Sequence, residues 1–417
     1  MADLRVQVDG LEFPNPFVIG SGPPGTNANV MKKAFKEGWG GVIAKTISLE
    51  ADKVQNVAPR YARMRATESR EVIGWENIEL ISDRPFQTWL DEFKQVKEAY
   101  PEGILIASIM EEYRKDAWQE ITERCQEAGV DAFELNFSCP HGLPERKMGA
   151  AMGQEPSIVS EVCGWVNEVA TIPVWAKMTP NITHIEDPAR AALDAGCEGI
   201  AAINTILSVM GVDLNTLRPE PTVEGYTVPG GYSCKAVRPI ALRMVMELAT
   251  MMYGGNSGKS IPKALDATPP PERKTERVDP AHVSPIGTFD AETPAGQYPD
   301  RSLSAIGGVE TGDDAAEFLL MGASTIQVCT GVMIHGYGLV QTMCEQLSAF
   351  MDKHGFTTID EFRGHSLQYF TTHAELVRRQ ADIKAAEKAT KAGMVTQDKT
   401  WDGEKFVEQS DKLVAND

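Results

Sequence analysis

Four polar side chains with hydrogen-bonding or reactive groups follow one apolar run of the chain, residues 131–135, and they are Asn136, Ser138, Cys139 and His141. The run reads as a buried strand, and the proline and glycine beside these residues predict that it ends there. An unperturbed thiol, with a pKa of about 8.5, is protonated at neutral pH and can act as an acid. A lone cysteine beside a strand is more often a small buried apolar residue. Catalysis by Cys139 is therefore a hypothesis that depends on the rest of the chain.

Polar residues also follow other apolar runs, and they are Lys45, Lys177, Asn204, Thr205, Cys329 and Thr330. Lysine and asparagine are seldom buried without a partner. In a barrel of parallel strands, the C-terminal strand ends converge on one cavity. We therefore expect a cavity in which lysines stabilise negative charge on an electron-rich ring. The amides and the threonine hydroxyl would suit a neutral heterocyclic amide.

Two glycine-rich stretches predict an anion site near the end of the barrel sequence. Gly307 and Gly308 are followed by Thr311 and Gly312, which predicts backbone N–H groups at the start of a helix. Residues 230–233, expected to open the sixth helix, would add donors. Barrels commonly hold a phosphate after their seventh and eighth strands. The glycines of residues 20–25 are not interpreted as a dinucleotide fingerprint, because two prolines there remove N–H donors.

The elements that must position these residues alternate regularly. After a predicted β-hairpin over residues 4–14, strands are expected at 17–20, 41–45, 104–110, 131–135, 174–177, 199–204, 303–306 and 325–329. Helices are expected at 29–37, 86–100, 118–128, 157–169, 188–195, 236–252, 313–321 and 338–353, with a long loop between the second strand and the second helix. Eight strand–helix pairs favour parallel pairing in a closed (β/α)8 TIM barrel. An open, doubly wound sheet is the alternative.

Two segments lie outside this rhythm. Residues 254–300 are rich in proline, glycine, serine, threonine and charge, and we expect a largely disordered insertion there. Residues 366–395 have a helical pattern, and a polar tail follows over 396–417. The expected organisation is a barrel domain over 1–355 and a C-terminal helical extension over 356–417.

Composition excludes several classes of protein. The net charge of -19 argues against a nucleic-acid binder. The seven cysteines form no CxxC pair, so neither an iron–sulfur ligand set nor a metal site is predicted, and free thiols suit a reducing compartment. No apolar run approaches the roughly 20 residues that span a bilayer. The N-terminus lacks a secretion signal, which leaves open a transit peptide removed ahead of this numbering. We expect a soluble protein that is not secreted.

Several motifs together resemble the flavin-containing barrel of the dihydropyrimidine dehydrogenase family. They are Asn77–Ser82 (NIELIS), Asn136–Gly142 (NFSCPHG), Glu145–Gly149, Ala176–Asn181, Ala202–Thr205 and Ile306–Gly308. The resemblance covers about residues 5–350. Residues 362–370 are similar to the short, single-domain plant and algal enzymes, which implies a plastid or cytoplasmic location. Dihydroorotate dehydrogenases share the barrel and an NxSCP motif, and are the alternative.

The resemblance implies FMN-dependent reduction of the C5=C6 bond of uracil and thymine. FMN phosphate would lie on Gly307, Gly308, Cys329, Thr330, Ser233 and Cys234. Lys177 would lie at the N1–O2 edge of the flavin, with Lys45 and Ser21 near the isoalloxazine. The pyrimidine would contact Asn77, Glu79, Ile81, Asn136, Ser138, Asn204 and Thr205. Cys139 would protonate C5 while reduced FMN delivers hydride to C6, and His141 would assist or only form a loop hydrogen bond.

Two departures from the family matter. The long members carry iron–sulfur clusters and an FAD domain that pass electrons from NADPH, and this chain has no such cysteines. Either NADPH reduces FMN directly or a partner protein does so. Cys234 stands where the long members have glycine. Self-association of the barrel is also expected. Two other classes of protein stay open: a Schiff-base aldolase that uses Lys45 or Lys177, and a barrel that has lost catalysis and serves as a binding scaffold.

Overall fold

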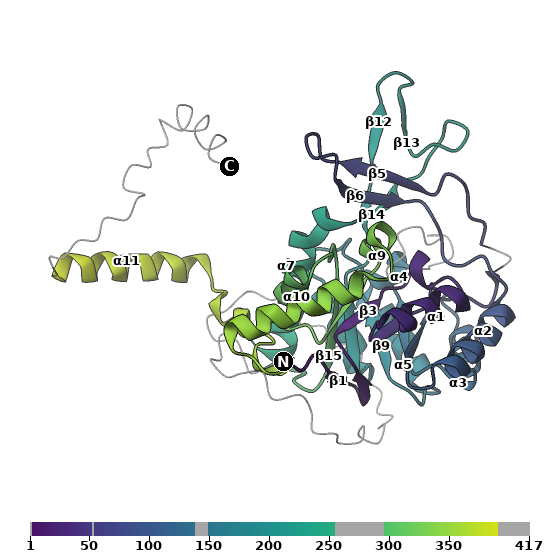
Figure 1. The fold of residues 1–417 in the computed structure, drawn as a ribbon, viewed down its shortest axis with the longest axis horizontal. Helices are drawn as coiled ribbons and strands as arrows, with labels where there is room; N and C mark the ends of the chain where they lie inside the picture. The colour runs from purple at the N-terminus through teal and green to yellow at the C-terminus, as the bar shows by residue number, and fades with distance from the viewer. Residues whose placement is uncertain (1, 52–53, 138–148, 255–295, 391–417) are drawn as a thin grey trace. The chain divides into compact units, whose positions relative to one another are not determined.

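The structure is a computed structural model that describes residues 2–51, 54–137, 149–254 and 296–390, with side chains described up to residue 381. Its described residues form two compact units, one that ends at Tyr369 and one that begins at Phe370. Each unit is described by itself. The first contains the barrel (Figure 1).

Eight parallel strands close into a barrel in the order β10-β15-β16-β3-β4-β7-β8-β9. Their bounds are β3 (Phe17–Ile19), β4 (Gly41–Ile43), β7 (Ile104–Ile109), β8 (Ala132–Asn136), β9 (Val174–Lys177), β10 (Gly199–Ala202), β15 (Ser302–Ile306) and β16 (Thr325–Val328). The strands are short apolar runs because both faces of a parallel sheet are covered. The predicted closed barrel is confirmed. Strands β4 and β10 end two residues earlier than predicted, so Lys45 and Asn204 lie in the loops that follow.

All eight predicted helices are present. They are α1 (Ala28–Glu37), α2 (Phe86–Ala99), α3 (Lys115–Glu127), α5 (Pro156–Asn167), α6 (Glu186–Asp194), α7 (Arg238–Tyr253), α8 (Gly312–Leu320) and α10 (Leu339–His354). Helix α1 shows why the boundaries were predictable. The Asn27 side chain accepts hydrogen bonds from two backbone N–H groups of the first turn, and Gly38 ends the helix at a φ of 100°. Short helical segments are η1 (Pro23–Gly25), α4 (Ala150–Gly153), η4 (Lys235–Val237) and α9 (Thr330–His335).

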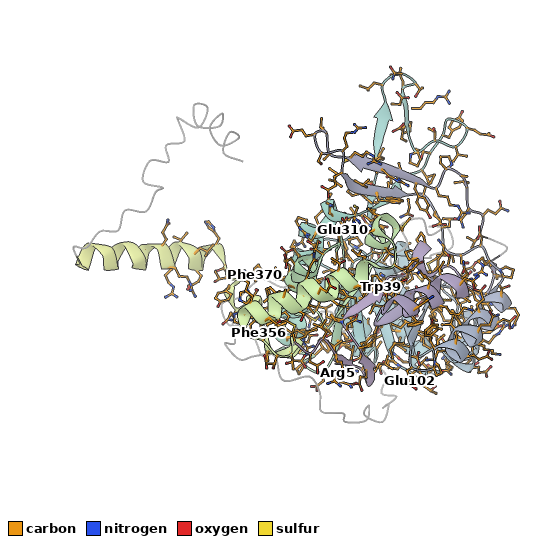
Figure 2. All side chains as sticks on the ribbon, in the orientation of Figure 1. Arg5, Trp39, Glu102, Glu310, Phe356 and Phe370 are labelled. Carbon is orange, nitrogen blue, oxygen red and sulfur yellow. The ribbon has the colours of Figure 1, made fainter. Side chains whose placement is uncertain are left out.

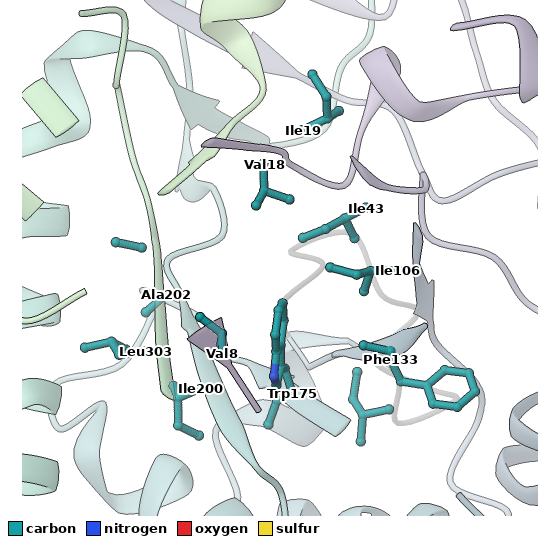
Figure 3. Packing of buried hydrophobic residues seen from close by; sticks show 14 of the residues in the cluster. Val8, Val18, Ile19, Ile43, Ile106, Phe133, Trp175, Ile200, Ala202 and Leu303 are labelled. Carbon is teal, nitrogen blue, oxygen red and sulfur yellow. The ribbon is translucent and has the colours of Figure 1, made fainter. Parts of the chain in front are cut away.

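The predicted N-terminal hairpin is confirmed and closes one end of the barrel. It consists of β1 (Val6–Val8) and β2 (Leu11–Phe13). Val8 is buried with Trp175 among the apolar residues of the core (Figure 3). At its turn, Asp9 accepts hydrogen bonds from Trp175 Nε1 at 2.6 Å and from Ser302 Oγ at 2.5 Å. The hairpin thus seals the end of the barrel at which β9, β10 and β15 begin.

An accessory antiparallel sheet covers the opposite end of the barrel (Figure 1). Its order is β11 (Ile206–Ser208), β14 (Gly230–Ser233), β6 (Val72–Asn77) and β5 (Tyr61–Arg65), and β12 (Gly211–Asp213) pairs separately with β13 (Arg218–Glu220). Two predictions were wrong here. Residues between β4 and α2 contain two strands, not only a loop, and Gly230–Ser233 is a strand that precedes η4 and α7. These strands are short, and β6 pairs with β14 more than 150 residues away, so local patterns carry little signal.

The barrel unit continues beyond the expected boundary at residue 355. Two short helices, η5 (Ile359–Glu361) and η6 (His365–Tyr369), belong to it. Phe362 is fully buried, and its ring lies 5.4 Å from that of Phe350 of α10. In the second unit, α11 spans His373–Thr390, so it begins seven residues later than the helix predicted over 366–395, whose last five residues lie outside the described residues. A non-helical stretch at 370–372 separates η6 from α11.

Most of the predicted disordered insertion, residues 255–295, lies outside the described residues, as does the tail over 391–417. The described end of the insertion contacts the barrel helices. The backbone N–H of Tyr298 donates to the carbonyl of Met252 at 2.9 Å, and its hydroxyl donates to Asp194 at 2.6 Å. In the part of the chain that the structure describes, no helix is both long enough and apolar enough to span a membrane.

Candidate active site

A cavity of about 1130 Å³, which includes space open to solvent, lies between the C-terminal strand ends and the accessory sheet. Every predicted site residue that the structure describes lines it. These are Ser21, Lys45, Asn77, Glu79, Ile81, Asn136, Lys177, Asn204, Thr205, Ser233, Cys234, Gly307, Gly308, Cys329 and Thr330. Ser138, Cys139 and His141 lie outside the described residues. Glu310, also in the lining, lies at the end of the barrel near the accessory sheet, whereas Arg5 lies at the other end (Figure 2).

The floor of the cavity is a buried polar network around Lys177, the last residue of β9. Its ammonium group donates to Glu134 Oε1 at 3.1 Å, to Gln327 Oε1 at 2.8 Å and to Ser21 Oγ at 3.3 Å. Lys177 is 2% exposed and Glu134 is fully buried. Since an ammonium group has three N–H donors, the three bonds fix its position. Ser21 also donates to Glu134 at 3.0 Å. The cation is thus held beneath the cavity by residues of three other strand regions, those of β3, β8 and β16.

A second ion pair joins the barrel to the loop that follows β6. Lys45 Nζ lies 2.7 Å from Glu79 Oε2, and both side chains are less than 10% exposed. Glu79 also accepts hydrogen bonds from Tyr61 Oη at 2.8 Å and from Arg60. Burial raises the pKa of Glu79, but the charge of Lys45 and the three donors outweigh burial, so the pKa is lowered overall. Glu79 is therefore an anion at neutral pH, and it neutralises Lys45.

Three amide side chains are held at other places on the wall. Asn136 Nδ2 donates to Thr46 Oγ1 at 2.9 Å, and Thr46 in turn lies 2.8 Å from Ser108 Oγ. Asn204 Oδ1 accepts from the backbone N–H of Thr205 at 2.7 Å. Asn77 Nδ2 donates to the carbonyl of Gly231 at 3.2 Å. Two strand regions of the barrel and the accessory sheet thus present amide groups to one cavity.

The predicted anion site needs one correction. The N–H groups at the start of α8 already have acceptors in the protein: those of Glu310 and Thr311 donate to Asp314, and that of Gly312 donates to Gln346. This helix start is therefore not a donor set for a ligand. The first turn of α9 leaves N–H groups without partners inside the helix. Thr330 and Gly331 of that turn both line the cavity.

Glycine is required in the wall between β15 and η4. Gly308 has a φ of 73°, and a Cβ atom there would lie 2.7 Å from the carbonyl oxygen of Cys234. Cys234 itself has a φ of 80°, a conformation that glycine adopts without strain. Opposite it, Thr330 Oγ1 lies 2.9 Å from Ser233 Oγ. This end of the cavity therefore combines backbone at close range with two hydroxyl groups.

The two described thiols in the cavity are not poised to ionise. Burial raises the pKa of Cys329 to about 11, although Lys177 and Lys45 oppose this. Burial likewise raises the pKa of Cys234 to about 11. Both are protonated at neutral pH, so they serve as neutral wall residues.

The residues present fit FMN. A phosphate suits the end of the cavity formed by Gly308, Ser233 and the first turn of α9. Lys177 offers a positive charge at the floor, where a flavin becomes electron-rich on reduction. Trp75 lines the cavity, and its buried indole N–H has no acceptor among the residues described, so a bound ligand could supply one.

Several lining or supporting residues were missed from the sequence. Glu134 and Gln327 lie inside apolar strands, and nothing local distinguishes them from other strand residues. Tyr61 and Trp75 come from the accessory sheet, which was not predicted. Thr46 was recognised as a polar residue at the end of the second strand, but its hydrogen bonds to Asn136 and Ser108 were not predicted.

A closed (β/α)8 barrel with lysines, amides and a glycine-lined anion end in one cavity defines a flavin-binding barrel of the oxidoreductase class. The sequence matches the family model described as dihydroorotate dehydrogenase over residues 3–255 and 300–351. The chain belongs to the dihydroorotate dehydrogenase family.

Three relatives illustrate the range of the family. The chain is 58% identical over 418 residues to the chloroplastic dihydropyrimidine dehydrogenase (NADP(+)) of Arabidopsis thaliana, covering 99% of this chain and 88% of the relative. It is 38% identical over 362 residues to the NAD-dependent dihydropyrimidine dehydrogenase subunit PreA of Escherichia coli strain K12, covering 87% and 76%. It is 30% identical over 365 residues to the catalytic subunit of dihydroorotate dehydrogenase B (NAD(+)) of Pyrococcus abyssi, covering 88% and 99%.

Solved structures support the fold. The crystal structure of DHODH in complex with ferulenol from Eimeria tenella aligns with a TM-score of 0.62 at 17% identity, covering 87% of this chain and 88% of that chain. At this identity the likeness concerns the fold alone.

Proposed function

We propose that this protein is a plastid dihydropyrimidine dehydrogenase that reduces uracil and thymine to their 5,6-dihydro forms with FMN and NADPH. The cavity that unites Lys177, the asparagines and the glycine-lined end carries the proposal. The 58% identity to the chloroplastic relative over 99% of the chain supports the substrate, the nucleotide and the location.

Each group of residues has a proposed task. Gly307, Gly308, Ser233, Cys234, Cys329 and Thr330 would hold the FMN phosphate end, with Ser21, Lys45 and Lys177 at the ring system. Bound FMN supplies the hydride that the reduction requires. Asn77, Glu79, Ile81, Asn136, Ser138, Asn204 and Thr205 would orient the pyrimidine by its amide edge. Cys139 would donate the proton to C5, and His141 would position that loop.

Dihydroorotate oxidation is the second candidate, favoured by the family model and the archaeal relative. One contact argues against it. Orotate carries a carboxylate that would need a cationic partner in the cavity, but the Lys45 ammonium already lies 2.7 Å from Glu79. The neutral ring of uracil makes no such demand.

A Schiff-base aldolase is less well supported. A lysine must be neutral to attack a carbonyl. The Nζ atoms of Lys45 and Lys177 are both held by buried carboxylates, Glu79 at 2.7 Å and Glu134 at 3.1 Å, so neither is free to approach a carbonyl carbon. Borohydride trapping with a carbonyl substrate would detect this activity.

The test uses the purified full-length protein under anaerobic conditions. We expect a bound flavin spectrum, bleaching by NADPH, and reoxidation by uracil but not by orotate. A protein that stays colourless after incubation with FMN would contradict the proposal, and reoxidation by orotate alone would favour the second candidate. Light scattering would show whether the protein self-associates, and addition of a separate reductase would show whether an electron-transfer partner is needed.

A further inference from the structure

The cavity-lining face of the accessory sheet continues outward into arginines. On β5, Tyr61 is paired with Asn77 and Arg63 with Trp75. Alternate residues of a strand point to the same face, and directly paired residues share that face. Arg63 therefore lies on the same face as Tyr61, Trp75 and Asn77, which all line the cavity. Its guanidinium group lies 4.5 Å from the centre of the Trp75 ring, so it extends the wall that Trp75 forms.

Two more arginines lie beyond Arg63 at the end of the same hairpin. Arg65 Nη1 donates to the backbone carbonyl of Arg70 at 2.8 Å, which brings the two residues together. All three arginines are exposed. Residues 60–70 contain four arginines and one acidic residue, although the whole chain has a net charge of -19. We call Arg63, Arg65 and Arg70 the arginine ledge.

The ledge differs from the other cations near the cavity mouth in having no counter-charge. Among the described residues, no carboxylate forms an ion pair with Arg63, Arg65 or Arg70. Lys235, by contrast, pairs with Glu71 and Glu310, and Arg60 pairs with Glu79. Paired cations are already satisfied, whereas the three guanidinium groups of the ledge remain available to an anion from solution.

We propose that the arginine ledge binds the phosphate groups of the dinucleotide that reduces the enzyme, including the 2′-phosphate of NADPH. This inference rests on the proposed function. The ledge starts at the cavity wall, so a dinucleotide with its nicotinamide in the cavity has its phosphates outside, along β5. Guanidinium groups bind phosphate with two parallel hydrogen bonds, which an exposed ammonium group does not provide.

The position of the ledge has a kinetic consequence. Tyr61 and Asn77 lie on the face that leads from the ledge into the cavity, and Asn77 is a proposed pyrimidine contact. Nucleotide and pyrimidine therefore enter by one mouth and exclude each other. The enzyme binds them alternately, and steady-state rates at varied NADPH and uracil give parallel double-reciprocal lines.

The test compares three variants of the full-length, FMN-loaded protein. Arg63→Gln/Arg65→Gln removes two charges of the ledge, and Arg63→Lys/Arg65→Lys keeps the charge but loses the paired hydrogen bonds. Arg190→Gln on α6, in the outer helix layer, removes one arginine that forms no ion pair with any described residue. The measurement is the dissociation constant of NADP+ by calorimetry, with NAD+ as the ligand that lacks the 2′-phosphate.

We expect the Arg63→Gln/Arg65→Gln protein to bind NADP+ at least about tenfold more weakly than the native protein. The dissociation constant of the lysine variant should lie between those two values. The affinity for NAD+ should change less than the affinity for NADP+. Arg190→Gln should match the native protein. In native protein, NADP+ binding should weaken with ionic strength more steeply than in the glutamine variant. If the glutamine variant has an NADP+ dissociation constant within roughly twofold of the native value, the inference is overturned. A twofold change corresponds to less than about 0.5 kcal/mol of binding free energy.

Two further results would separate the causes of failure. Reoxidation of the dithionite-reduced native protein by uracil tests the proposed function without any nucleotide. One combination of results overturns the inference while the proposed function stands. In it, uracil reoxidises the flavin, NADPH neither binds the protein nor reduces the flavin, and an acidic electron-carrier protein reduces the flavin instead. The ledge would then not be a nucleotide site.

Discussion

Lys177 and Glu134 form an ion pair on the barrel floor, with Lys177 Nζ 3.1 Å from Glu134 Oε1. Neither side chain reaches solvent to more than 2%. The pair lies directly under the cavity, because Lys177 also lines it. Removing one partner of a buried ion pair costs more stability than replacing both partners, because it leaves an uncompensated charge in the interior. Glu134 therefore fixes both the position and the net charge of the group that the cavity presents from below.

Replacing Glu134 by glutamine should destabilise the protein by about 3 kcal/mol, because the Lys177 charge is left without its counter-charge. The double variant Glu134→Gln/Lys177→Gln should lose less than the sum of the two single variants. Urea unfolding of all four proteins gives this double-mutant cycle. Additive losses would show that the two residues are not coupled. In the single variant, the midpoint potential of bound flavin should become more positive, since the uncompensated cation stabilises the more electron-rich form.

Gly308→Ala should abolish tight FMN binding. Its φ of 73° strains any side chain, and a Cβ atom would lie 2.7 Å from the carbonyl oxygen of Cys234 in the cavity wall. Gly355→Ala is the matched control, because Gly355 has a φ of 76° with nothing within 4 Å of an added Cβ atom. Both variants should lose about 1 kcal/mol of stability from backbone strain. Only Gly308→Ala should lose flavin, as measured by fluorescence titration; equal affinity in the two variants would remove Gly308 from the proposed phosphate site.

Cys139→Ser should keep the flavin spectrum and lower the turnover of uracil about 100-fold, because a hydroxyl is a much weaker acid than a thiol. Cys344→Ser on α10 is the control, since it changes the same atom in a half-buried residue of the outer helix layer. The reduction of the flavin by NADPH should be unaffected in both variants, so the defect is confined to the pyrimidine step. Uracil turnover by Cys139→Ser at the native rate would exclude Cys139 as the proton donor.

The sequence predicted the barrel because its signals are local. Each strand is a short apolar run, and caps such as Asn27 and Gly38 mark the ends of a helix within a few residues. It also predicted Lys45, Lys177 and the asparagines, because polar residues after apolar runs are conspicuous. What it predicted about Cys139 and His141 stays a prediction, since both lie outside the described residues.

The partners of those residues could not be predicted in the same way. Glu134 looks like any residue of its strand, and its partners Lys177 and Gln327 are 43 and 193 positions away. Glu79 belongs to a predicted motif, but nothing local shows that it pairs with Lys45. The accessory sheet was missed because its strands are short and partly polar and find their partners across the chain. As a result, the arginine ledge became visible only with the register of β5 and β6.

Asp9 should make stability depend on pH in the neutral range. Burial raises the pKa of its carboxyl group to about 7, although Ser302 and Trp175 donate to it. Between pH about 4 and 7 the folded state then holds more protons than the unfolded chain, so the free energy of unfolding falls as the pH rises and levels off above 7. Asp9→Asn keeps the acceptor oxygen, suits the φ of 50° and cannot ionise. It should flatten the pH profile and stabilise the protein at pH 8 by on the order of 2 kcal/mol.

Asp3→Asn on the same hairpin is the control. Hydrogen bonds from Arg5 lower the pKa of the Asp3 carboxyl group, so the loss of that carboxylate should not stabilise the protein. Urea unfolding at pH 5, 6, 7 and 8 measures the effect, and a native profile that rises over this range would show that the Asp9 carboxyl is ionised in the folded protein.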